Sequence, residues 1–184
     1  MQDLPPRTRG EISSALLELH RESLLYWNGL LAETFFRPIG TAWSPADNVR
    51  HLSKSIRPVA KALALPRITL LAFGWSRRPG RSYEEMRETY QAALAAGGKA
   101  GRFAPSPRPL PEDPDGGRAS VMREHEEAAD ALRRAMEPWS ESALDRWRLP
   151  HPLLGRLTVR EMLLFTLYHN RHHLEGVRRK LAAA

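Results

Sequence analysis

Hydrophobic residues recur along most of the chain every three or four positions, the spacing of an amphipathic α-helix. The last apolar segment carries hydrophobic residues around much of its circumference, which is typical of a helix buried between neighbours. We therefore expect an all-α fold, an up-and-down four-helix bundle with an extra short helix. The pattern predicts helices over residues 11–36, 45–66, 82–96, 120–137 and 158–181.

Local signals mark the starts of three of these helices. Ser44 can accept a hydrogen bond from a first-turn amide, and Pro45 suits the first helical position, where an N–H is not needed. The segments 82–85 (Ser-Tyr-Glu-Glu) and 158–161 (Thr-Val-Arg-Glu) are capping boxes. Only residues 68–73 resemble a strand, and they are too short and isolated to predict a sheet.

We expect a single domain over residues 1–184, because this length matches one hydrophobic core. Residues 1–9 are expected to be a flexible N-terminus. Residues 97–118 are rich in Gly, Pro and charge, so they can bury little apolar area and should form a long, mobile loop.

The composition narrows the chemistry that is available. There is no cysteine, so disulfides and thiolate metal sites are excluded, and any metal must bind histidine or carboxylate. The net charge of +7 comes from scattered Arg and Lys rather than a basic cluster, so we expect no nucleic-acid partner. We see no apolar signal-peptide core and no membrane-length apolar run, and we expect a cytoplasmic protein without a membrane partner.

Three histidines form the strongest candidate site. His169 and His173 are four residues apart on the last predicted helix, so their side chains project from one face on consecutive turns. Two imidazoles in this arrangement can chelate zinc or nickel, and a third ligand from another helix would leave a position open for water or substrate. His51, early in the second predicted helix, is the natural third ligand.

Other interpretations of these residues remain open. A histidine on an apolar stripe is more often a hydrogen-bonded core residue than a metal ligand, and His172 could replace one member of the pair. We expect His20 and His125, which also fall on largely apolar faces, to be structural residues or to support the metal ligands without binding the metal. Asp47 could orient the His51 ring, although a carboxylate in a first helical turn is favoured by the helix dipole alone.

Three segments together resemble the DinB-like (YfiT-like) metal-binding superfamily: Trp43 to Leu52, His151 to Thr158, and His169 to His173. The resemblance implies a four-helix bundle in which His51, His169 and His173 hold a divalent metal ion. One departure is Gly176, which stands where members often carry Gln.

The resemblance also implies classes of function. Relatives include S-transferases that use low-molecular-weight thiols such as bacillithiol or mycothiol, and a mycothiol-dependent maleylpyruvate isomerase. We therefore expect a metal-dependent enzyme with a small-molecule substrate, such as an S-transferase that takes a low-molecular-weight thiol as its second partner. The alternative is a helical bundle, with or without metal, that has no catalytic activity and serves as a stress-related or interaction protein. A homodimer is expected, because relatives commonly pair and the first and third predicted helices are rich in aromatic residues.

Overall fold

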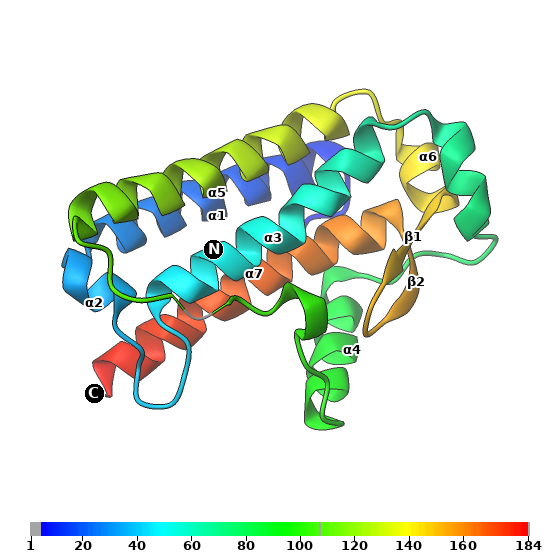
Figure 1. The fold of residues 1–184 in the computed structure, drawn as a ribbon. Coiled ribbons are helices and arrows are strands. Elements are labelled where there is room, and N and C mark those ends of the chain that lie inside the picture. The colour runs from blue at the N-terminus through cyan, green and yellow to red at the C-terminus, as the bar shows by residue number, and fades with distance from the viewer. Residues whose placement is uncertain (1–4, 107, 184) are drawn as a thin grey trace.

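A computed structural model describes residues 5–106 and 108–183 of the chain. Four long helices lie side by side as a bundle, with α4 projecting away from it (Figure 1). In the bundle α5 contacts α1 and α3, and α7 contacts the other sides of α1 and α3. The bundle helices are α1 (Arg9–Gly29), α3 (Pro45–Ala64), α5 (Pro114–Met136) and α7 (Val159–Ala182).

The bundle helices do not simply alternate in direction. Helices α3 and α5 run parallel, since Ser53 contacts His125 near the middle of both and Leu63 contacts Trp139 at their ends. The connection between them contains short helices and returns the chain to the end of the bundle where α3 began (Figure 1). These elements are η1 (Arg67–Phe73), α4 (Tyr83–Ala95) and η2 (Gly101–Phe103). The four-helix bundle is confirmed, and its helices run up, down, down and up.

A two-stranded hairpin precedes α7, where no strand was predicted. Strand β1 (Arg148–His151) pairs antiparallel with β2 (Gly155–Thr158), and its turn has Gly155 at φ 74°, a conformation that glycine adopts readily. The one strand-like segment of the sequence forms the 3-10 helix η1 instead. The hairpin begins directly after α6 (Glu141–Arg146). The residues before β1 are bound to a distant segment, because Trp147 forms an antiparallel bridge with Trp75 and the Ser76 N–H donates to the Arg146 carbonyl at 2.7 Å.

The first predicted helix is wrong in one respect, because it is broken in two. Helix α1 ends at Gly29, and α2 (Ala32–Phe36) follows after two extended residues. The Arg118 guanidinium donates to the backbone oxygens of Asn28 and Leu30, which the break leaves without helical partners. The bend allows Trp27 and Phe35 both to be fully buried.

The long predicted loop is also shorter than expected. Helix α5 begins at Pro114 rather than at residue 120, because Asp113 caps it by accepting from the Gly116 N–H and Pro114 occupies the first turn. Residues 101–103 form η2. At the N-terminus, residues 1–4 of the expected flexible segment lie outside the described part, and its last residue, Arg9, already begins a helix that Thr8 caps.

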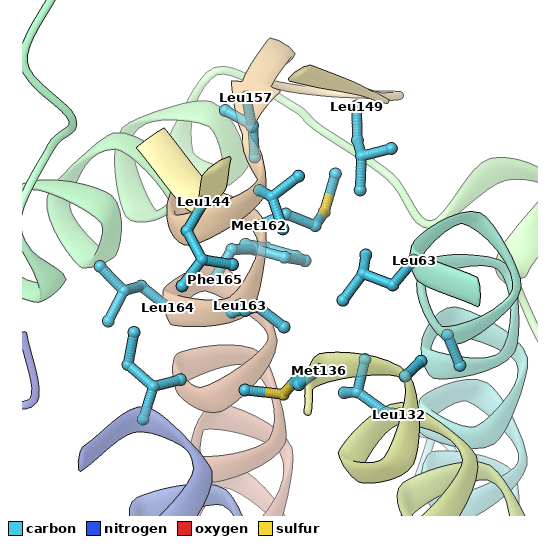
Figure 2. Packing of buried hydrophobic residues seen from close by; sticks show 14 of the residues in the cluster. Leu63, Leu132, Met136, Leu144, Leu149, Leu157, Met162, Leu163, Leu164 and Phe165 are labelled. Carbon is cyan, nitrogen blue, oxygen red and sulfur yellow. The ribbon is translucent and has the colours of Figure 1, made fainter. Parts of the chain in front are cut away.

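The core forms around the N-terminal half of α7. All residues from 161 to 170 are buried, which confirms a helix surrounded by neighbours. Figure 2 shows side chains from several elements converging there, with Leu163 and Phe165 of α7 facing Leu63 of α3 and Leu132 of α5. Within the described ranges, no helix is both long and apolar enough to cross a membrane.

Candidate metal centre

His51, His169 and His173 meet where α3 crosses α7. The Nε2 atom of His169 lies 3.1 Å from Nε2 of His51 and 3.1 Å from Nε2 of His173. One ligand atom from each of the three rings lies within 4.8 Å of the others. The antiparallel packing of the two helices therefore brings together the three histidines that the sequence predicts as metal ligands.

The outer nitrogens of two rings are held by hydrogen-bond acceptors. His51 Nδ1–H donates to the Phe103 carbonyl oxygen at 2.8 Å, and His173 Nδ1–H donates to Asn48 Oδ1 at 2.7 Å. The amide of Asn48 is itself oriented, because its Nδ2 donates to the Ser44 carbonyl at 2.9 Å. With the proton on Nδ1, each neutral ring directs the lone pair of Nε2 toward the centre.

This arrangement fits a bound cation. The Nε2 lone pairs of His51 and His173 both face Nε2 of His169. The neutral His169 ring carries at most one N–H, so it can donate to only one of the two lone pairs. Burial lowers the pKa of all three rings, well below the usual value for His169 and His173, so the imidazoles are neutral at pH 7. Neutral imidazole nitrogens are ligands for zinc and related ions, with metal–nitrogen distances of about 2.0–2.1 Å.

Aromatic rings surround the three histidines. The Trp43 ring is parallel to His173, with centroids 6.3 Å apart, and lies 5.2 Å from His51. On the other side the Phe165 ring stacks on His169 at 5.0 Å. These rings restrict rotation of the imidazoles and give the centre apolar surroundings on two sides, which strengthens electrostatic interactions there.

A pocket of about 360 Å³ opens from the histidines. Its walls come from α3, α4, η2, the hairpin and α7, and most of its surface is apolar. The ring nitrogens of the triad can therefore be reached by a small molecule from one side. Protic groups also line the pocket, from Tyr90, His151 and His172.

The other candidate residues have separate roles. His172 lies outside the triad and contacts the rings of Tyr90 and Tyr168, at 5.9 Å from each. His125 is fully buried against Ser53 and 5.3 Å from His20, and burial lowers the pKa of His125 to about 3. His20 and His125 are therefore packing residues of the bundle, as expected.

Asp47 does not orient His51. Its carboxylate accepts from Ser44 Oγ, the cap of α3, and forms an ion pair with Arg50, three residues further along the helix, at 3.3 Å. The interpretation of Asp47 as a residue of the helix start is therefore the correct one. The partner of His51 is the Phe103 carbonyl, which lies in the segment predicted as a mobile loop and which no sequence signal identifies.

Replacing Asn48 with alanine should weaken zinc binding by roughly 10- to 100-fold, because His173 loses the acceptor that orients it. Competition with a chromogenic chelator at pH 7.5 measures this change. The matched control is Asp47→Asn on the same helical turn, which contacts Arg50 and Ser44 but no triad residue. Equal affinities in the Asn48 variant and the wild type would show that this hydrogen bond does not support metal binding.

Comparisons with known proteins place this geometry in a family. A family model described as the DinB superfamily matches residues 16–177. A solved structure described as TT2238, a four-helix bundle protein, superposes with a TM-score of 0.58 at 17% identity, covering 94% of this chain and 99% of that one. That likeness concerns the fold, and no curated protein matches the sequence significantly. Because the family model spans most of the sequence, including residues from all four bundle helices and the histidine triad, the chain belongs to the DinB superfamily.

Proposed function

We propose that this protein is a metal-dependent enzyme that transfers an organic group to a low-molecular-weight thiol. The observation that supports this proposal is the convergence of three neutral imidazoles at the wall of a largely apolar pocket. Three protein ligands, rather than four, are typical of catalytic zinc sites, where the remaining position receives water or substrate. We further propose zinc or nickel as the metal, because both accept imidazole ligands.

The reaction is a substitution at carbon. The sulfur of the thiol forms a bond to the electrophilic carbon, the leaving group departs with the bonding electron pair, and the thiol proton is released to solvent. A bound divalent metal supplies one component, since it lowers the pKa of a coordinated thiol and so provides thiolate at neutral pH. The nucleophile must come from outside, because the chain has no cysteine.

The chain's own residues contribute position and environment. His51 and His173 are held by Phe103 and Asn48, so their ring nitrogens do not need to reorient when a ligand arrives. Trp43 and Phe165 pack against the imidazoles and provide apolar surroundings on two sides of the centre. The protic groups of the pocket favour a catalytic role over the alternative, a bundle without activity, because such a bundle needs no polar group near an open metal position.

Activity assays on metal-loaded protein test the proposal. Metal analysis of the purified protein comes first, followed by thiol consumption with 1-chloro-2,4-dinitrobenzene and a panel of glutathione, cysteine, bacillithiol and mycothiol. We expect at least one thiol to react faster than the uncatalysed background, and His51→Ala to return the rate to background. His20→Ala, which alters a histidine outside the triad, should retain activity. Metal-loaded protein that accelerates none of these reactions would favour the non-catalytic alternative.

A further inference from the structure

His151 carries a hydrogen-bond donor that the proposed metal site does not use. It ends strand β1, and its Nδ1 accepts from the backbone N–H groups of Leu153 at 3.2 Å and Leu154 at 3.0 Å. A ring nitrogen that accepts two hydrogen bonds bears no proton. Burial also lowers the pKa of His151 to about 4, so the ring is neutral at pH 7 and its single proton is on Nε2.

This ring forms part of the pocket wall beside the triad. It packs edge-to-face on Phe165, with centroids 4.3 Å apart, and Phe165 in turn stacks on His169. Within residues 5–106 and 108–183, no atom hydrogen-bonds to its Nε2. The hydroxyls of Ser55 and Thr166, also in the pocket, already donate to backbone carbonyls of their own helices. The His151 N–H is thus a donor on the wall of a largely apolar pocket, free to donate to an acceptor on a molecule that enters it.

The charges around the pocket have one sign. Lys99 and Arg102 are its charged residues, and no Asp or Glu lines it in the described part of the chain. The Arg102 guanidinium lies over the Phe103 ring, 5.1 Å from its centroid, and the Phe103 carbonyl holds His51. Both cations are exposed, so they attract anions through the general field rather than through a buried ion pair.

We propose that the pocket binds an apolar organic acid, a small molecule with a hydrocarbon or aromatic body and a carboxylate, and that His151 Nε2–H donates to an oxygen of that molecule. The apolar walls take up the body, and Lys99 and Arg102 favour the anionic form over neutral or cationic analogues. The size of the pocket suits a small molecule rather than a peptide or nucleic acid. This inference rests on the proposed function, for which it names the class of organic substrate.

Calorimetric titration with 4-phenylbutyrate and 4-phenylbutylamine, which share an apolar body and differ in charge, tests the proposal. The titrations are made at pH 7.5 on metal-free and zinc-loaded protein, so that coordination of the carboxylate to zinc is separated from recognition by the pocket. We expect the acid to bind in both forms, and more tightly than the amine. His151→Asn should weaken binding of the acid roughly tenfold or more, because a hydrogen bond to a charged group is lost.

The substitution to asparagine is chosen because its Oδ1 can replace Nδ1 as acceptor for the turn, while its amide does not extend to the position of Nε2. His20→Asn, outside the pocket, is the matched control and should leave the affinity unchanged. If circular dichroism shows that His151→Asn does not fold, the same titrations are made on the double variant Lys99→Gln, Arg102→Gln. This variant should show a smaller preference for the acid over the amine than the wild type does.

Two results would overturn the inference: the amine binding as tightly as the acid, or a folded His151→Asn protein with unchanged affinity for the acid. Zinc affinity is measured separately in a chelator competition. A protein that binds the acid but not zinc contradicts the proposed function and leaves this inference intact. A protein that binds zinc but neither probe contradicts this inference alone.

Discussion

Added zinc should raise the melting temperature of the metal-stripped protein at pH 7.5, and His169→Ala should remove most of that increase. A ligand that binds only the folded state stabilises it by about 2.7 kcal/mol at a concentration 100 times its Kd. For a chain of this size that corresponds to a shift of roughly 5–10 °C. His169 is the central residue of the triad, since its Nε2 is 3.1 Å from both other rings, so its loss should reduce the affinity most.

The control for this experiment is His172→Ala. His172 is on the same helix and close in sequence, but it contacts Tyr90 and Tyr168 and does not belong to the triad. Its variant should keep most of the zinc-induced increase, measured by differential scanning fluorimetry with and without metal. Equal loss of the increase in the two variants, or no increase in the wild type, would mean that the metal ligands are wrongly assigned.

The second large effect concerns Glu161, and here we expect Glu161→Ala to lower the free energy of unfolding by about 3 kcal/mol. The Glu161 side chain has an exposed fraction of 0%. Its carboxylate accepts from the backbone N–H of Thr158 at 2.8 Å, and from the backbone N–H and Nε of Arg81 at 3.1 and 3.0 Å. Alanine leaves the buried Thr158 N–H without this acceptor and separates the start of α7 from the segment before α4. Urea unfolding measures the change.

Glu85 provides the comparison, because it occupies the same position in the capping box of α4. It accepts from Ser82 N–H at 2.7 Å, but at an exposed site where water can replace it. Glu85→Ala should therefore cost only about 1 kcal/mol or less. Losses of similar size in the two variants would contradict the importance of burial at Glu161.

Glu161 should also make the stability of the folded protein sensitive to acid. Burial disfavours the charged carboxylate, but the hydrogen bonds from Arg81 and Thr158 outweigh that cost and lower the pKa of Glu161 in the folded protein. A lowered folded-state pKa gives stability that is present above the unfolded value, near 4.5, and is lost as the pH falls through the folded value. The urea midpoint of the Glu161 variant should accordingly depend less on pH in this acidic range.

Local sequence determined the starts of α3 and α7 and brought together two of the three candidate ligands. The Ser44 cap and the Thr158–Glu161 capping box act within one turn, so they operate whatever the chain packs against, and both are present in the structure. The chelating pair His169 and His173 follows equally from helix geometry, because residues four apart on an α-helix always share a face.

Only the tertiary structure decided the rest. The approach of His51 to the pair depends on the register of α3 against α7, and the orientation of its ring depends on Phe103, 52 residues away in sequence. The break after Gly29 is stabilised by Arg118, and the start of the hairpin before α7 is bound to Trp75 and Ser76. Such features arise from contacts between distant residues, whose free energy exceeds weak local preferences and leaves no periodic pattern in the chain.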